Sequence, residues 1–205
     1  MAGKMIYLVR HGQTVLNLEG RYQGRIDSPL TPLGIAQAGA VGRRLAQIRA
    51  GDGGDWRIET STQGRARQTA AIIAAAAGLP PPRPDERLVE AGYGELEGLT
   101  RPEVDARWPQ FRGQVGTFGR APGGESLEAL TARAAAWLAD HPESATHTVA
   151  VSHASTGRVL RGLYHGLDLE ATRRLETPQD AFHRLAGGRV ERIEVGELPP
   201  ETPPA

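Results

Sequence analysis

The sequence of 205 residues contains no cysteine. This absence excludes disulfide bonds, thiol nucleophiles and zinc–thiolate sites. Long apolar runs are lacking too, because the longest, Ala70 to Ala77, is too short to cross a bilayer. Met1 to Arg10 lacks the apolar core and the small-residue cleavage site of a secretory signal. We therefore expect a cytoplasmic protein without a membrane partner.

Net charge is absent as well, since 24 basic side chains balance 24 acidic ones. Such a chain argues against nucleic acid or an anionic membrane as the main partner. Lysine is nearly missing: Lys4 is the only one, which leaves 23 arginines (24 − 1). The planar fork of arginine suits phosphate. GC-rich coding bias also produces this excess, and we attribute most of the arginines to it.

The length of the chain predicts one domain over residues 1–197, with a small lid or insertion around 91–124. The proline-rich tail, 198–205, is expected to be disordered. Residues 12–30 are expected to be irregular, because glycine and proline interrupt them. Residues 80–84 and 113–124 are expected to form loops for the same reason.

Short apolar runs and helical periodicity alternate along the chain. Strands are predicted at 5–9, 57–60 and 147–152, helices over 31–48, 63–77, 126–140 and 155–164, and a hairpin within 181–195. This alternation indicates an α/β fold, a three-layer α/β/α sandwich with a mostly parallel central sheet. Ligands of such sheets bind at the carboxyl ends of the strands, so the active site is expected there.

Two histidines stand at such strand ends. Arg10-His11 follows the first predicted strand, and His153 follows the strand at 147–152. If these strands are neighbours, the two imidazoles meet in one crevice. Arg65 lies in the first turn of a predicted helix, and the amides of Ala154 and Ser155 begin another, so two helix N-termini would favour an anion there. A histidine alone would more often merely end a strand; the grouping predicts a site for a dianion.

Several ordered blocks of the sequence resemble the histidine phosphatase superfamily, in its phosphoglycerate mutase-like branch. The blocks are Leu8 to Asn17, Arg21 to Gly24, Asp27 to Gly34, Arg65 to Ala70, Leu88 to Glu90, Gly94 to Gly98, Gly124 to Ser126 and Val151 to His153. A single Arg-His-Gly would be weak support, whereas many blocks in order are specific. The resemblance covers roughly residues 4 to 165.

The resemblance implies a role for each matching residue. His11 would be the nucleophile that becomes phosphorylated, and Glu90 the proton donor to the leaving group. The phosphoryl oxygens would be bound by Arg10, Arg65 and His153, with further hydrogen bonds from Asn17, Gln23 and the amide of Ala154. Two arginines and a protonated His153 can supply the positive charge that Mg²⁺ supplies in other phosphoryl transfers. We therefore expect neither a metal nor another cofactor.

His11 must attack through an unprotonated nitrogen, so its other ring nitrogen needs a hydrogen-bond acceptor. A backbone carbonyl of a nearby glycine is the candidate. His11, His153 and Glu90 could in principle bind a metal instead, although the two guanidiniums would repel it. The other histidines, His141, His147, His165 and His183, show no metal-ligand spacing and are expected to be inert.

The sequence departs from the family pattern at three places. Ala154 stands where glycine is common. Gln63 and Gly64 precede Arg65 where an apolar residue is typical, and we expect them to loosen the helix start that directs Arg65. Residues 91–98 share features with both mutases and phosphatases. Among the nearby acids, we choose Glu90 over Glu86, Glu95 and Glu97, which are expected to be solvated.

These features predict a phosphomonoester hydrolase that acts through a phosphohistidine on a small phosphorylated metabolite. A phosphoglycerate mutase is the first alternative. It is disfavoured because the segment 91–123 is shorter than the insertion that encloses the substrate of the mutases it resembles. The second alternative, a non-catalytic module that binds phosphorylated partners, should lack the nucleophile or the acid. The sequence does not name the substrate, and it is compatible with a homodimer.

Overall fold

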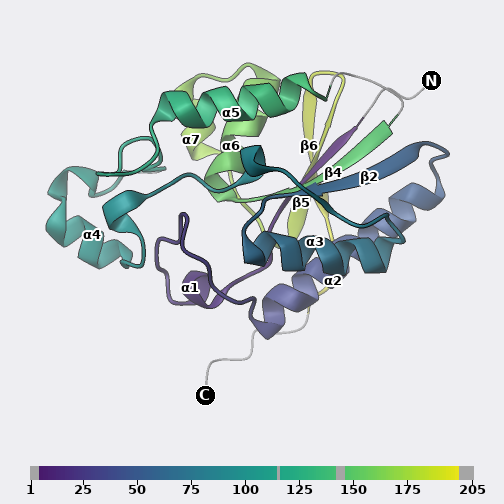
Figure 1. Cartoon of the computed structure of the whole chain (residues 1–205), viewed down its shortest axis with the longest axis horizontal. Coiled ribbons are helices and arrows are strands. Elements are labelled where there is room, and N and C mark those ends of the chain that lie inside the picture. The colour runs from purple at the N-terminus through teal and green to yellow at the C-terminus, as the bar shows by residue number, and fades with distance from the viewer. Residues whose placement is uncertain (1–4, 115, 142–145, 199–205) are drawn as a thin grey trace.

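A computed structural model describes residues 5–114, 116–141 and 146–198. Within them lies a six-stranded sheet of order β3-β2-β4-β1-β5-β6 (Figure 1). The strands are β1 (Ile6–Arg10), β2 (Asp55–Thr60), β3 (Arg83–Pro84), β4 (Thr146–Ser152), β5 (Ala181–Ala186) and β6 (Arg189–Glu194). β3, β2, β4 and β1 pair in parallel, whereas β5 and β6 are antiparallel to their neighbours. This arrangement confirms the predicted mostly parallel sheet.

Helices cover both faces of this sheet, which confirms the three layers (Figure 1). The helices are α1 (Val15–Leu18), α2 (Pro32–Ala50), α3 (Gly64–Ala77), α4 (Arg101–Arg107), α5 (Leu127–Ala139), α6 (Ala154–His165) and α7 (Leu169–Arg174). α2 and α3 pack together on one face, and α5, α6 and α7 lie on the other. Short 3₁₀ turns occupy Glu86–Leu88, Gly94–Leu96 and Pro109–Phe111. Among the described residues, no helix is long and apolar enough to pass through a membrane.

The side chains of β1 alternate between the two faces, as the period of two along a strand requires. Ile6 and Leu8 contribute to a core with Trp137 of α5, while Tyr7 and Val9 contribute to the core on the opposite face. These four apolar residues of β1 are all buried. Because each large apolar side chain contributes about 1.5–3 kcal/mol when buried, this strand is strongly fixed between the layers. It therefore gives its carboxyl end a firm position.

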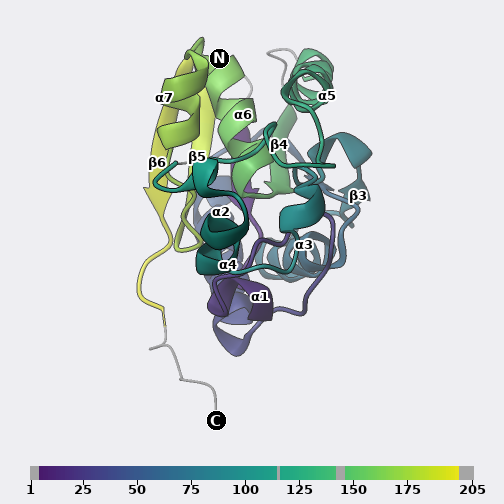
Figure 2. The ribbon, with the colours of Figure 1, turned by 90° about the vertical axis from the view of Figure 1, so that its left-hand side faces the viewer.

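The pairing of β1 with β4 places the two predicted site histidines next to each other. The register aligns Arg10 with Ser152. The following residues, His11 and His153, thus leave the sheet at the same edge. Their juxtaposition was predicted on the condition that the two strands are neighbours, and that condition is met. α1 and α4 lie beyond this end of the sheet, on the left in Figure 1 and toward the viewer in Figure 2.

The structure also contains elements that the sequence did not predict. α1 lies within the segment 12–30, which was expected to be irregular, and the two-residue strand β3 lies in the expected loop at 80–84. α4 and α7 were missed, although Thr100 and Asp168 cap them with side-chain oxygens. Both helices are short, so their apolar periodicity is hard to detect. The predicted hairpin is confirmed as β5 and β6, and the tail beyond Leu198 lies outside the described residues.

Two glycines allow the start of α2 to lie against the loop that follows His11. A Cβ at Gly34 would lie 2.1 Å from the carbonyl oxygen of Gln13, and one at Gly12 would lie 2.2 Å from that of Gly34. Neither glycine has a positive φ, so space and not backbone conformation requires glycine here. The helix and the loop of His11 are therefore held in direct backbone contact.

Gly34→Ala is expected to lower the free energy of unfolding by about 1–3 kcal/mol, because the added methyl group must push the backbone apart. Gly53→Ala is the matched control: nothing lies within 4 Å of its Cβ position, and we expect a change within about 0.5 kcal/mol. Urea unfolding measures both. Equal stability of the two variants would contradict the close packing described here.

Candidate active site

The imidazole of His11 has an acceptor on one side and a donor on the other. Its Nδ1 lies 2.8 Å from the carbonyl oxygen of Gly12, and the Nε of Arg65 lies 3.3 Å from its Nε2. A carbonyl can only accept and a guanidinium can only donate. Nδ1 therefore carries the hydrogen, and Nε2 keeps its lone pair. The glycine carbonyl expected from the sequence is confirmed.

His11 is buried, with 3% of its surface exposed. Burial, followed by the positive charges of Arg10 and Arg65, holds the pKa of His11 well below its usual range. The hydrogen bond to Gly12 opposes this shift only in part. The ring is accordingly neutral near pH 7, as a nucleophile requires.

Arg65 is held by the loop that precedes α2. Its Nη1 donates to the carbonyl of Ile26 at 2.9 Å and to the Asp27 carboxylate at 3.1 Å, and its Nη2 donates to the carbonyl of Gly24 at 2.8 Å. Burial lowers its pKa, while nearby carboxylates, Glu90 first, oppose that shift. We call residues 24–27 the Arg65-binding loop. It fixes the guanidinium so that Nε points at His11.

His153 stands beside His11, with 5.0 Å between the ring centroids. Its Nε2 lies 2.8 Å from the hydroxyl of Ser61, which also accepts from the amide of Gln63 at 3.2 Å. The hydroxyl can donate its hydrogen to Nε2, an arrangement in which the ring hydrogen is on Nδ1. Burial, followed by the charges of Arg65, His11 and Arg10, holds the pKa of His153 well below its usual range. These surroundings favour a neutral ring, and the protonated His153 expected beside a bound phosphoryl group stays a prediction.

Among the described residues, three buried side-chain nitrogens of the predicted phosphate-binding residues have no hydrogen-bond partner. They are Nε of Arg10, Nε2 of Gln23 and Nδ1 of His153. Burial of such donors is unfavourable unless a partner satisfies them. All three belong to residues that the sequence assigned to phosphate. Arg10 is otherwise held at Nη1 by the carbonyl of Thr177 at 2.7 Å, and burial lowers its pKa to about 10.

Asn17 lies beside Gln23, and the phosphate-binding role of both stays a prediction. Its Nδ2 is 3.5 Å from the Oε1 of Gln23, which also accepts from the hydroxyl of Thr14 at 3.1 Å. Thr14 and Asn17 form the capping box of α1. The short helix that the sequence analysis missed therefore positions both amide side chains.

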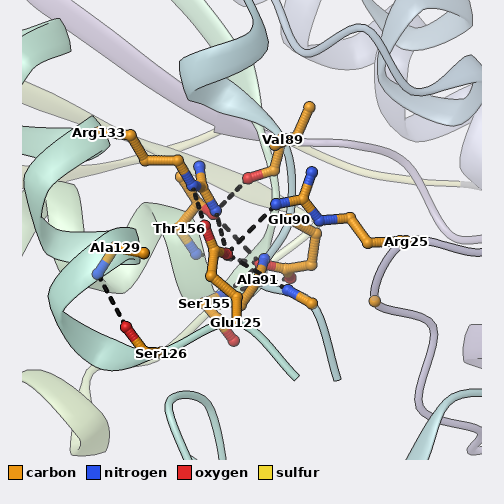
Figure 3. Close-up of polar contacts among 12 residues, drawn as sticks. Arg25, Val89, Glu90, Ala91, Glu125, Ser126, Ala129, Arg133, Ser155 and Thr156 are labelled. Carbon is orange, nitrogen blue, oxygen red and sulfur yellow. Dashed lines mark hydrogen bonds and ion pairs between the residues drawn. The ribbon is translucent and has the colours of Figure 1, made fainter. Parts of the chain in front are cut away.

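Glu90 is bound at the start of α6 (Figure 3). One carboxylate oxygen accepts from the amides of Ala91 at 2.8 Å, Thr156 at 3.1 Å and Ser155 at 3.2 Å, and the other accepts from Ser155 at 3.1 Å. The side chain is 5% exposed. The Ser155 amide, expected to face phosphate, is thus used by Glu90. Ala154 is the first residue of α6, and its role stays a prediction.

A partly buried ion pair supports the segment that carries Glu90. The carboxylate of Glu125 accepts from Nε and Nη2 of Arg133 at 2.7 and 2.9 Å. Arg133 also donates to the hydroxyl of Thr156, which in turn donates to the carbonyl of Val89 at 2.6 Å (Figure 3). The sequence block Gly124 to Ser126 had no assigned role. Its glutamate fixes the main chain on both sides of Glu90, since it also accepts from the amide of Gly92.

The expectation that Gln63 and Gly64 loosen the start of α3 is wrong. The Gln63 side chain donates to the carbonyl of Gly24 at 2.9 Å and accepts from the amide of Glu90 at 2.8 Å. Gly64 leaves room for the carboxylate of Asp27, because a Cβ there would lie 2.3 Å from it. Both departures from the family pattern therefore strengthen contacts around Arg65.

Two further residues of the site were missed. Ser61 binds His153, as described above, and Gln179 donates to the carbonyl of His11 at 2.9 Å and to Asn17 at 3.3 Å. Ser61 follows a predicted strand end, which is a signal that could have found it. Gln179 lies in the segment before β5, and nothing local in the sequence marks it.

The remaining histidines have partners elsewhere. His141 binds Glu59 at 2.9 Å, His147 binds Asp52 at 2.8 Å, His183 lies 3.4 Å from Glu176, and His165 lies near the carbonyl of Gly188. In the part of the chain that the structure describes, no three His, Cys, Asp or Glu side chains are grouped as metal ligands would be. The metal alternative therefore has no ligand set among these residues.

Comparisons with known proteins show the family of the chain. A model of the histidine phosphatase superfamily, branch 1, matches residues 6–191. A curated relative of Yersinia pestis named "Probable phosphoglycerate mutase GpmB" is 37% identical over 199 residues, which cover 95% of this chain and 86% of the relative.

Solved structures with the same fold include proteins named as phosphatases. Bacillus stearothermophilus YhfR is 28% identical, with a TM-score of 0.75 over 93% of this chain and 96% of its own. A mycobacterial glucosyl-3-phosphoglycerate phosphatase in complex with VO3 is 27% identical, with a TM-score of 0.73 over 95% of this chain and 97% of its own. The names of these similar proteins thus include both mutase and phosphatase, the two activities between which the sequence did not decide.

The lowered pKa values predict that His11 and His153 stay neutral at pH 6.5. Protonation would begin only further below that pH, so chemistry that needs the free Nε2 of His11 is retained as the pH falls through 6.5. Imidazole ¹⁵N shifts measured between about pH 5 and 8 would show this. In urea, where the chain is unfolded, both histidines should have a pKa of about 6.5. Half-protonation of folded His11 at pH 6.5 or above would contradict the electrostatic account.

Proposed function

Because the chain belongs to the histidine phosphatase superfamily, branch 1, we propose that it hydrolyses a small phosphomonoester through a phosphohistidine formed on His11. The observation that carries the proposal is the environment of that ring. Nδ1 is bound to a carbonyl, Nε2 keeps its lone pair, and buried nitrogens of Arg10, Gln23 and His153 have no partner among the described residues. This environment supports His11 as the nucleophile and the buried nitrogens as donors to a phosphoryl group.

In the first step, Nε2 of His11 attacks phosphorus. The P–N bond forms as the bond from phosphorus to the leaving oxygen breaks, and the charge on the equatorial oxygens grows. Nε of Arg10, Nδ1 of His153 and Nε2 of Gln23 are the donors we assign to these oxygens. Arg65, whose Nε faces His11, adds a second positive charge.

Glu90 supplies a proton to the leaving oxygen and therefore must be protonated at that moment. In the second step, the carboxylate takes a proton from water. The resulting nucleophile attacks phosphorus, the P–N bond breaks, and phosphate leaves with free His11 restored. The hydrogen bonds from Ala91, Ser155 and Thr156 keep the carboxyl in place for both steps.

The mutase alternative is favoured by the name of the curated relative. Hydrolysis is favoured by the short segment 91–123 and by the name of the mycobacterial neighbour, which is a phosphatase of a phosphorylated metabolite and binds VO3. Phosphate release from 3-phosphoglycerate or related esters supports hydrolysis. Isomerisation of 3-phosphoglycerate that depends on 2,3-bisphosphoglycerate, with little phosphate release, would favour the mutase.

His11→Ala is expected to abolish both p-nitrophenyl phosphate turnover and the phosphoenzyme recovered after an alkaline quench, because it removes the proposed nucleophile, Nε2 of His11. The matched control is His165→Ala, an exposed histidine of α6, which should turn over like the wild type. Wild-type activity should survive EDTA. Turnover by His11→Ala, or loss of wild-type activity on chelation, would contradict the proposed function. Absence of wild-type turnover on a broad panel of phosphate esters would favour a binding module.

A further inference from the structure

We propose that Gln63 is a positioning residue that couples the phosphate-binding Arg65 to Glu90; this inference rests on the proposed function for the role of Glu90. In the described structure, the hydrogen bonds of the Gln63 side chain go neither to His11 nor to the proposed phosphate donors of Arg10, Gln23 and His153. It acts instead through main-chain groups of the two segments between which it lies. No such role follows from the family resemblance, which places an apolar residue at this position.

The side chain of Gln63 bridges two segments that are far apart in the sequence. Gln63 is the residue before α3, and its side chain does not cap that helix. Its Nε2 donates to the carbonyl of Gly24 at 2.9 Å, and its Oε1 accepts from the amide of Glu90 at 2.8 Å. The Arg65-binding loop and the Glu90 segment are therefore joined through one amide group.

The carbonyl of Gly24 connects this bridge to Arg65. It accepts from Nη2 of Arg65 at 2.8 Å and from Gln63 at 2.9 Å, so both of its lone pairs are used. The Gln63 side chain thus links Arg65 to the amide of Glu90 through the carbonyl of Gly24. A shift of the guanidinium on binding phosphate would be passed to the main chain of Glu90 by this route.

Other contacts hold the Arg65-binding loop in place, so loss of the bridge should not unfold the site. The carboxylate of Glu97 accepts from the amides of Arg25 and Tyr93, both at 2.9 Å, and it fills the space above Gly24. Arg25 also pairs with Glu125 at 3.4 Å. Removal of the Gln63 amide is therefore expected to change the position of Glu90 more than the stability of the fold.

An apolar side chain of similar size would break the bridge selectively. In Gln63→Leu, the amide of Glu90 loses its acceptor and the carbonyl of Gly24 loses one donor, while Arg65 keeps all three of its loop contacts. The attack by His11 should then persist. Protonation of the leaving group should become slower, because a small displacement of a reacting group lowers the rate strongly.

The test compares an alkyl phosphate, which needs a proton on its leaving group, with p-nitrophenyl phosphate, which needs it far less. We expect Gln63→Leu to lower kcat/KM for the alkyl ester on the order of 10-fold to 100-fold more than for the aryl ester. Gln63→Met, a second apolar variant, should lower the two kcat/KM values in the same way as Gln63→Leu. Gln68→Leu, at an exposed position of α3, is the control and should leave the ratio of the two kcat/KM values unchanged.

A double variant separates positioning from a general structural effect. Glu90→Gln should itself lower the alkyl-to-aryl ratio, and Gln63→Leu should lower it no further in that background, because both act on one group. Fully additive effects, or equal losses for both esters in Gln63→Leu and Gln63→Met, would overturn the coupling while leaving the proposed function intact. If Glu90→Gln leaves the ratio unchanged, the acid role of Glu90 fails, and the inference falls with it.

Discussion

The hydrogen bond between Nδ1 of His11 and the carbonyl of Gly12 determines what this site can do. It leaves the lone pair on Nε2, which faces Arg65, and not on the nitrogen that faces its own backbone. Gly12 can take this position because it packs directly on the backbone of Gly34. The same contact joins the nucleophile to α2. The chemistry and the packing of the helix therefore depend on a single backbone arrangement.

The site concentrates positive groups in a buried place, and carbonyls and carboxylates offset them. Arg65 is satisfied by two carbonyls and Asp27, and Arg10 in part by Thr177. The two histidines are held neutral by burial and by these charges. A dianion entering such surroundings would meet preorganised donors, which is the main source of catalysis expected for phosphoryl transfer.

Much of this arrangement could be predicted from the sequence, because it follows from local patterns and one topological rule. The apolar runs before His11 and His153 predicted two strands, and parallel strands end at the same edge of a sheet. The roles of Gln63 and Gln179 could not be predicted, since each binds backbone groups of distant segments that no local pattern reveals. The lowered pKa of His153 depends on burial and on the charge of Arg65, and both follow only from the folded structure.

The central claim is that the phosphoryl group is transferred to Nε2 of His11. Nuclear magnetic resonance of the ¹⁵N-labelled phosphoenzyme, trapped during turnover, tests it most directly, because the two ring nitrogens give different phosphorus couplings. The account predicts a phosphohistidine at residue 11 with phosphorus on Nε2 and hydrogen on Nδ1. Phosphorus on Nδ1, on another residue, or on no residue of an actively turning-over enzyme would contradict it.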